Sequence, residues 1–430
     1  MVLLRLTKCL KLDLCGRLHA AAAQRLATGE IVIDSETYKI DSVTNVPRRV
    51  LSLLNRRLHL QKHSPISLLS RRIAHYFYQG YRKRYGTSPL FTVVDNLSPV
   101  VSVYQNFDSL LVPEDHISRR PNETYYINAN TCLRSHTSAH QCDLIRSGLD
   151  AFLAVGDVYR RDAIDRRHFP AFHQMEGVRL FTPEELLGDH ASHLKLFEPI
   201  AAQRTSEKQE LLTTDASKLC EQNLKMCLEG LVEFLFGSDV QRRWVDAYFP
   251  FTHPSFELEV FHEGEWIETL GCGIVEQAIL KNCGAGTKIG WAFGLGLDRL
   301  AMKLYKIPDI RLFWTKDAAF MFQFETDDIH KDIEYQPISP YRQIANDLAF
   351  WIPDNFSSND FYELVRDVGD DTVETVRLLD EFTHPKTKRR SHCYRIYYRR
   401  PERNLTQAEV NIVHSTIAST AASLLGVEIR

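Results

Sequence analysis

The segment "GDVYRRDAIDRRHFPAFHQMEG", residues 156–177, is the stretch that decides how this chain folds. Its two ends read as strands, and the run between them is charged but interrupted by aromatic residues. Because neighbouring side chains on a strand face opposite ways, Arg160 and Arg161 cannot both point into one site. Gln174 and Glu176 do share a face. If the two strands pair, one arginine and an amide–acid pair project from a single sheet surface.

The loop between these strands carries Arg166, Arg167, His168 and Phe169. An arginine fork binds phosphate through two parallel hydrogen bonds, and an aromatic face stacks on a purine. The loop therefore suits a nucleoside triphosphate. The alternative is a surface hairpin laced with salt bridges, each of which stabilises little.

A second segment, "GWAFGLGLDRLAMKLYKI" at residues 290–307, reads as a strand, a glycine pair and a helix. Its apolar residues recur at helical spacing and predict a buried stripe, with Arg299 off that stripe in the first turn. A cation there is unfavourable beside the helix dipole unless an anion lies nearby, and the helix N-terminus itself attracts anions. The alternative is an ordinary helix with one exposed arginine. The spacing is not that of a dinucleotide fingerprint.

Two shorter segments also hold candidate ligand-binding residues. In "RSHTSAHQ", residues 134–141, His136 and Ser138 share a face of an extended segment, although Ser138 and Gln141 also fit a helix capping box. In "EWIETLGCG", residues 265–273, Glu268 stands beside glycines and could hold Mg²⁺ or an amino group. It equally fits a solvent-facing position on an amphipathic strand.

Composition limits the classes of function that remain. The 430 residues are 44% apolar and 25% charged, which is typical of a soluble protein of two or three domains. A net charge of −3 means that an anionic partner must meet local basic patches. The nine cysteines form no CxxC pair, so we expect no zinc site and no disulfide scaffold. No uncharged apolar run reaches 18 residues, so we expect no membrane span.

The chain divides into four predicted parts. Residues 1–30 have leucines at helical spacing, five Lys/Arg and two acids, which is typical of a mitochondrial presequence, although an ordinary first helix is the alternative. Residues 31–325 form the main domain, and residues 326–340 form a polar linker that ends in two prolines. Residues 341–430 follow the order β-α-β-β-α-β of a ferredoxin-like split βαβ module. The expected fold class is α+β.

Taken together, the strand–loop–strand with its arginine and the later Gly-x-Gly-x-Asp-Arg helix resemble motifs 2 and 3 of the class II aminoacyl-tRNA synthetases. The segments "HTSAHQ", "FHQMEG", "YFPFTHPSFE" and "LGCG" narrow the resemblance to the phenylalanyl-tRNA synthetases. The single short chain, its presequence-like start and its C-terminal module are similar to the monomeric mitochondrial members. The resemblance spans residues 35–430.

This resemblance implies a fold, an activity and partners. It implies an antiparallel sheet flanked by helices that activates L-phenylalanine with ATP and Mg²⁺. The phenylalanyl group would then pass to the 3′ end of tRNA-Phe in the mitochondrial matrix. Arg160 and Arg299 would be the catalytic residues, and Glu268 would lie near Mg²⁺. The implied ATP-binding residues are Arg160, Arg167, His168, Phe169 (against adenine), Glu268 and Arg299. The implied phenylalanine- and adenylate-binding residues are His136, Ser138, Ala139, His140, Gln141, Gln174, Met175, Glu176, Phe249, Phe251, Ala292, Phe293 and Gly294.

The C-terminal module supplies the RNA-binding prediction. Residues 386–403 hold eight Lys/Arg against Glu402 alone, and tyrosines 394, 397 and 398 lie among them. Such a stretch could meet phosphates and stack on unpaired bases, or it could be a solvated edge strand protected by charge. The resemblance to an anticodon-binding module favours RNA, with the linker as a hinge on which the module moves. The residues expected to bind tRNA are Lys386, Lys388, Arg389, Arg390 and Arg395.

Two other functions remain open at this point. One is a non-catalytic RNA-binding or regulatory relative of a class II synthetase, and the other is a different class II-like ligase that activates a small acid. All the motif residues expected of the enzyme are present, which favours amino-acid activation.

Overall fold

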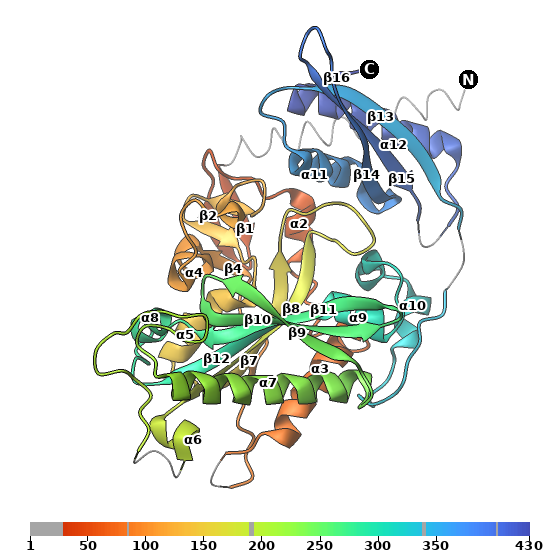
Figure 1. Cartoon of the computed structure of the whole chain (residues 1–430). Helices are drawn as coiled ribbons and strands as arrows, with labels where there is room; N and C mark the ends of the chain where they lie inside the picture. The colour runs from red at the N-terminus through yellow and green to blue at the C-terminus, as the bar shows by residue number, and fades with distance from the viewer. Residues whose placement is uncertain (1–28, 84–85, 189–192, 338–340, 401–402) are drawn as a thin grey trace, which may run out of the picture.

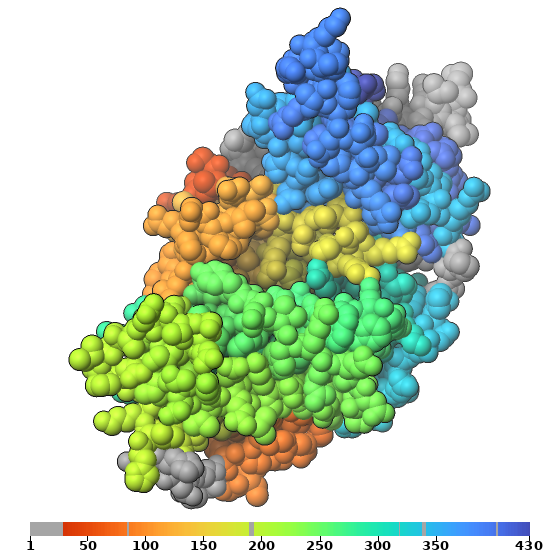
Figure 2. Space-filling view, viewed as in Figure 1, coloured from red at the N-terminus to blue at the C-terminus, as the bar shows by residue number. Residues whose placement is uncertain are grey.

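The computed structural model describes residues 29–83, 86–188, 193–337, 341–400 and 403–430. The chain forms a large body around one mixed sheet and a smaller C-terminal body that sits above it (Figure 1). In the space-filling view the C-terminal residues, in blue, rest against the yellow segment that contains residues 156–177 (Figure 2). The predicted presequence lies almost entirely outside the described residues.

The large body is built on a seven-stranded sheet in the order β3-β7-β8-β12-β11-β10-β9. All neighbours are antiparallel except β3 and β7, which run parallel. The two segments singled out by the sequence therefore lie side by side at the centre, because β8 pairs directly with β12. The strands are β3 (Thr92–Val94), β7 (Ala151–Tyr159), β8 (Ala171–Phe181), β12 (Ile289–Gly296), β11 (Glu265–Val275), β10 (Thr252–His262) and β9 (Arg242–Phe249).

Helices and two small sheets surround this sheet. The helices α3 (Pro65–Gly80), α7 (Thr214–Phe236) and α9 (Leu297–Leu304) pack under one face, as Figure 1 shows. The strands β1 (Glu30–Ile33) and β2 (Glu36–Lys39) form a hairpin, and a three-stranded sheet has the order β4-β6-β5, with bounds Val100–Ser102, Thr131–Leu133 and Tyr126–Asn128. The shorter helices are α2 (Arg48–Leu53), α4 (Val103–Asn106), α5 (Gln141–Arg146), α6 (Pro183–Leu187), α8 (Gln277–Asn282) and α10 (Ala318–Gln323).

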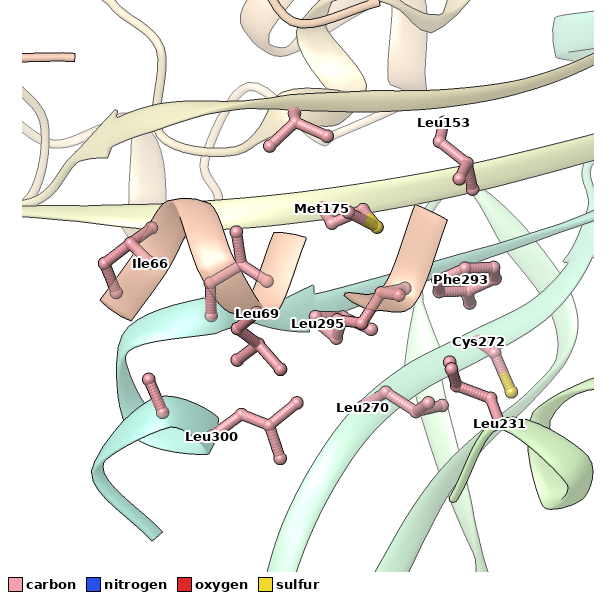
Figure 3. Packing of buried hydrophobic residues seen from close by; sticks show 14 of the residues in the cluster. Ile66, Leu69, Leu153, Met175, Leu231, Leu270, Cys272, Phe293, Leu295 and Leu300 are labelled. Carbon is pink, nitrogen blue, oxygen red and sulfur yellow. The ribbon is translucent and has the colours of Figure 1, made fainter. Parts of the chain in front are cut away.

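The two faces of the central strands have different environments. Met175 on β8 and Phe293 on β12 are 0% and 2% exposed, and they point toward the helices among Leu153, Leu270 and Leu295 (Figure 3). Residues of opposite parity on the same strands therefore face away from this core. On that face a second apolar cluster covers Val178, Leu180 and Ala292, and the part of β8 around Gln174 and Glu176 remains to carry a site.

The C-terminal body has the predicted ferredoxin-like order. Its sheet has the order β14-β15-β13-β16, with α11 and α12 packed together against it. The predicted capping box of Thr406 and Glu409 starts α12, and Gly426 ends it in the left-handed region at φ 64°. The elements are β13 (Ile344–Ile352), α11 (Ser358–Gly369), β14 (Val373–Thr383), β15 (Arg390–Tyr398), α12 (Gln407–Leu425) and β16 (Glu428–Ile429).

The C-terminal body packs against the loop between β7 and β8. Ile164 is buried in the C-terminal core, and its carbonyl accepts a hydrogen bond of 2.9 Å from the backbone N–H of Val376. Arg161 forms a 2.9 Å ion pair with Asp360, yet it lines the same cavity as Arg160, so the prediction that the two arginines cannot share one site is wrong. No helix or strand occurs among the described residues between Gln323 and Ile344. The domain boundaries proposed at 325 and 340 stay a prediction.

The described part of the chain contains no helix long and apolar enough to cross a bilayer.

Close packing at the β8–β12 pair makes a glycine necessary. A Cβ on Gly177 would lie 2.1 Å from the ring of Phe293, whose own position is fixed by a stacked contact with Phe77. We expect Gly177→Ala to lower the free energy of unfolding by about 1–3 kcal/mol through overpacking. Urea denaturation measures the loss. Gly294→Ala is the matched control on β12, because a Cβ there has no atom within 4 Å; an equal loss in both variants would contradict this account.

Candidate active site

A cavity of about 580 Å³ opens on the face of the sheet opposite the hydrophobic core. Figure 2 shows the hollow between the orange, yellow and green segments, beneath the C-terminal body. Residues from all the segments named by sequence line it. Among the predicted site residues, those in the lining are His136, Ser138, Arg160, Gln174, Glu176, Phe249, Phe251, Glu268, Ala292, Phe293 and Gly294.

Arg160 follows directly after β7 and is held from two sides. Its Nε donates a 2.8 Å hydrogen bond to the carbonyl of Ser135, and its guanidinium lies 5.2 Å from the centre of the Phe172 ring. Burial lowers the pKa of Arg160, while Asp162 acts in the opposite direction and the positive charge of Arg299 lowers it further. Arg299 is thus close enough for the two guanidinium groups to repel each other. An anion between them would relieve that repulsion.

Arg299 is absent from the cavity lining; it is exposed in the first turn of α9 and contacts the motif 2 loop. Its Nη2 donates to Nε2 of His168 over 2.7 Å, and Nδ1 of His168 lies 2.6 Å from Asp165. These two contacts occupy both ring nitrogens of His168, and its predicted contact with ATP stays a prediction. Arg167 is exposed and forms a 3.6 Å ion pair with Glu265 at the tip of the β10–β11 hairpin.

The side chains of several predicted site residues point away from the cavity. Phe169 is 7% exposed and stacks on Trp314 with ring centres 5.4 Å apart, so it does not present a free face to adenine. Phe172, which the sequence reasoning missed, has the parity of Gln174 and Glu176 and lies beside Arg160. The ring of Phe293 lies in the core, so only the backbone of this residue borders the cavity.

Four other residues were predicted to bind substrate because they adjoin binding residues in the sequence motifs, but they do not line the cavity. Met175 is fully buried in the core below the sheet because it alternates with Gln174 and Glu176. Ala139 packs in a second apolar cluster, and His140 lies 3.0 Å from the buried Arg134. Gln141 is 2% exposed at the start of α5 and is absent from the cavity lining. Thr137, next to Ser138, lines the cavity although it was not predicted.

The buried end of the cavity is built around Glu176. Burial raises the pKa of Glu176 to about 8, although the hydroxyls of Ser138 and Thr137 partly offset this. Burial, reinforced by the charge of Arg160, lowers the pKa of His136 to about 3, so its imidazole is neutral. Within the described residues, Oε2 of Glu176 and Nδ1 of His136 are buried without a hydrogen-bond partner. A ligand that donates hydrogen bonds, such as an ammonium group, would satisfy this acceptor.

An aromatic wall stands beside this polar end. The rings of Phe249 and Phe251 are nearly parallel, at 10°, with centres 5.8 Å apart. Phe249 packs so closely over β11 that a Cβ on Gly271 would come within 2.8 Å of its ring. Ala292 and Gly294 on β12 keep the opposite wall low. The arrangement fits a flat apolar group of benzyl size.

An acidic group lies on the other side of Arg160. Simple alternation along β11 would turn Glu268 toward the core with Leu270, but a register shift at Thr269 brings it opposite Glu259, on the outer face. The pKa of Glu257 is raised by burial and then by the negative charge of Glu268, so the two carboxylates are close. One or two carboxylates beside phosphate oxygens are the usual protein contribution to a Mg²⁺ site. Among described residues no group of three His, Cys, Asp or Glu is arranged around a metal site.

Comparison with known families accounts for this combination of groups. The family described as "tRNA synthetases class II core domain (F)" matches residues 54–187 and 208–324. The mitochondrial phenylalanine–tRNA ligase of Mus musculus is 52% identical over 95% of this chain and 91% of that protein.

The chain belongs to the mitochondrial phenylalanine–tRNA ligase family.

More distant relatives agree with this assignment. The probable mitochondrial phenylalanine–tRNA ligase of Drosophila melanogaster is 48% identical over 93% of this chain and 92% of its own length. The mitochondrial enzyme of Saccharomyces cerevisiae is 37% identical over 94% and 96%. The expectation of a class II core is therefore confirmed.

The phenylalanine–tRNA ligase family assignment extends to the C-terminal body. The family described as "Ferredoxin-fold anticodon binding domain" matches residues 339–430. Of the cations predicted to bind RNA, Lys386, Lys388 and Arg390 are exposed near the tip of the β14–β15 hairpin. Arg395 is held by Asp347 over 2.6 and 2.7 Å, and Arg389 is paired with Glu428.

Two of the three tyrosines proposed to stack on bases have another role. Tyr394 and Tyr398 are 0% exposed in the C-terminal core, so they are not available. Trp351 and Phe382 instead lie on the outer sheet face with ring centres 6.3 Å apart. The guanidinium groups of Arg389 and Arg430 lie 4.9 and 4.8 Å from the Trp351 ring.

The raised pKa of Glu176 should make this phenylalanine–tRNA ligase family member less stable as pH rises. In the unfolded chain the carboxyl ionises near pH 4.5, whereas the folded protein keeps its proton up to about pH 8. Wild-type stability from this group therefore falls across that window, and Glu176→Gln removes the loss. We expect the variant's advantage in free energy of unfolding to grow by roughly 1–3 kcal/mol between pH 5 and pH 8.

Urea denaturation at pH 5, 6.5 and 8 measures that advantage. Glu114→Gln, at an exposed position, is the control for which no such trend is expected. A pH-independent difference between Glu176→Gln and the wild type would contradict the buried, protonated carboxyl.

Proposed function

We propose that this chain activates L-phenylalanine with ATP and transfers the phenylalanyl group to the 3′ end of tRNA-Phe in the mitochondrial matrix, acting as a monomer. The observation that carries the proposal is a cavity that brings together Arg160, a buried carboxyl with an unsatisfied oxygen and an aromatic wall, with Arg299 near enough for its charge to lower the pKa of Arg160. The two arginines suit a triphosphate. The carboxyl and the aromatic wall suit the ammonium and the ring of phenylalanine.

Charge governs the activation step. The carboxylate of phenylalanine attacks the α-phosphorus of ATP and displaces pyrophosphate, but the two reactants are both anions. Arg160, fixed by Ser135 and Phe172, offsets that repulsion and stabilises the charge that builds on the phosphoryl oxygens. Arg299, oriented by His168, holds the departing pyrophosphate end. Little proton transfer is required, so positioning supplies most of the acceleration.

The buried carboxyl selects an amino acid. On binding, Glu176 gives up its proton and accepts a hydrogen bond from the substrate ammonium, which replaces the partner that its Oε2 lacks. Gln174, His136 and Ser138 border the same end and would orient the polar part of the substrate. The benzyl group would lie along Phe249 and Phe251, where edge-to-face aromatic contact is favourable.

The metal proposal rests on the two neighbouring carboxylates. Glu268 and Glu257 would together hold Mg²⁺. The cation would relieve the repulsion between the two carboxylates, which contributes to the raised pKa of Glu257. When bound, Mg²⁺ neutralises phosphate charge and polarises the phosphoryl group. That no zinc is needed stays a prediction.

The outer face of the C-terminal sheet is the proposed anticodon contact. The exposed ring of Phe382, and that of Trp351 once an arginine leaves its face, would stack on unpaired bases, and Lys386, Lys388 and Arg390 would supply charge for the backbone. We propose that the C-terminal body moves on its linker when tRNA docks. This movement would break its contacts with Ile164 of the motif 2 loop.

ATP–pyrophosphate exchange with each of the twenty amino acids tests the proposed activity. We expect exchange with phenylalanine, and a loss of roughly 10²–10³-fold in kcat for Arg160→Ala, because the donor acts on charge that develops in the transition state. Arg146→Ala is the control, since this exposed arginine pairs with Asp143 and is absent from the cavity lining. Absence of exchange with all twenty would favour a non-catalytic RNA-binding relative.

Aminoacylation kinetics test the RNA face separately. Trp351→Ala should raise KM for tRNA by roughly 5- to 100-fold through loss of base stacking, and should leave pyrophosphate exchange unchanged. Trp266→Ala, an exposed tryptophan on the catalytic body that also carries an arginine, is the control. An unaltered KM for tRNA in the Trp351 variant would place the anticodon elsewhere.

A further inference from the structure

Two buried side chains beneath the cavity join motif 2 to motif 3. Asp298 and His173 are 1% and 0% exposed, and each directly precedes or follows a residue of the proposed site. Asp298 is followed by Arg299, whereas His173 lies between Phe172 and Gln174 on β8. Neither side chain lines the cavity, so neither can touch a substrate.

The hydrogen-bond ladder between the two motifs explains the position of Asp298. The pairing of β8 with β12 ends at Gln174 and Gly296, where the chain leaves the sheet to begin α9. His173, the neighbour of Gln174 on β8, is paired with Asp157 of β7 on one side but has no partner from β12 on the other. Its backbone N–H donates instead to Oδ2 of Asp298 over 2.5 Å. The carboxylate thus continues the ladder by one residue beyond the end of β12.

The imidazole of His173 completes the connection. Its Nδ1 lies 3.2 Å from the same Oδ2, so the Nδ1–H tautomer donates a second hydrogen bond to Asp298. The ring is stacked on Trp314, with centres 5.6 Å apart, and it lies 5.7 Å from the ring of His59. Packing on both sides leaves the imidazole little freedom to turn, so the carboxylate is held in one place.

We infer that His173 and Asp298 are a positioning pair that sets the separation between the motif 2 strand and the motif 3 helix, and thereby aligns Arg299 with Arg160 on one triphosphate. This inference rests on the proposed function. Arg299 is exposed, and its one described hydrogen bond is to a loop histidine, so its side chain is weakly held in place. The start of α9 is fixed by Asp298. Release of this clamp misaligns the phosphate end of the site and leaves the phenylalanine end in place.

Pyrophosphate exchange with ATP and phenylalanine varied in turn tests the pair. Asp298→Ala is expected to lower kcat/KM for ATP by roughly 10- to 100-fold, through a higher KM and a lower kcat. Its KM for phenylalanine should stay within about twofold of the wild type. His173→Leu removes only the imidazole hydrogen bond and should have a smaller effect of the same kind. The double variant should be no worse than Asp298→Ala, because Asp298→Ala already removes both hydrogen bonds.

Conservative replacements should rescue the phosphate end. Asp298→Asn keeps an acceptor for the His173 N–H, and His173→Asn places an amide N–H near the position of Nδ1. Both should retain exchange within roughly fivefold of the wild type. Failure of both rescues would show that the contact does not act as described.

A stability control separates positioning from mere weakening of the fold. Leu228→Ala removes a fully buried side chain on α7 and should lower Tm without changing either KM below the transition. The inference is overturned if Asp298→Ala raises both KM values equally, if it changes neither, or if Leu228→Ala gives the same ATP-specific defect. Absence of exchange in the wild type would overturn the proposed function itself, which distinguishes the two failures.

Discussion

Repulsion between two guanidinium groups is the constraint on which the rest of the site depends. Arg160 and Arg299 come from segments about 140 residues apart, and the field of one lowers the pKa of the other. Their approach is imposed by the pairing of β8 with β12, which places the end of motif 2 against the start of α9. A triphosphate bound between the two guanidinium groups would offset their repulsion.

The opposite end of the cavity follows the same principle with the opposite sign. Glu176 is buried against Ser138 and Thr137 with one oxygen unsatisfied, and burial keeps its proton at neutral pH. A buried acceptor of this kind destabilises the free protein and becomes satisfied when an ammonium binds. In the proposed mechanism, amino-acid and phosphate recognition occupy separate ends of the site, so we expect the His173–Asp298 contact to affect the phosphate end alone.

Much of this could be predicted from sequence because it depends on strand alternation. The shared face of Gln174 and Glu176 and the ferredoxin-like order of the last 90 residues follow from local patterns. Alternation failed for Arg160 and Arg161, which line one cavity because β7 ends at Tyr159. Met175 was placed in the site through its neighbours in the motif, although the same alternation puts it in the core.

Other features depend on tertiary contacts that no local pattern records. The strand resumes at Ala171, so Phe172 and not Phe169 takes the face beside Arg160, and Phe169 is held by the distant Trp314. The bulge at Thr269 reverses the direction of Glu268. In the C-terminal sheet, Asp347 on the neighbouring strand forms an ion pair with Arg395. The basic composition of residues 386–403 had predicted a cation free to bind RNA.

A crystal structure with phenylalanine and a non-hydrolysable ATP analogue tests the central claim most directly. The account predicts that guanidinium nitrogens of both Arg160 and Arg299 lie about 3 Å from oxygens of the same triphosphate, with the phenylalanine ammonium at Glu176. An analogue bound with only one of these arginines, or with the two on different molecules, would contradict it.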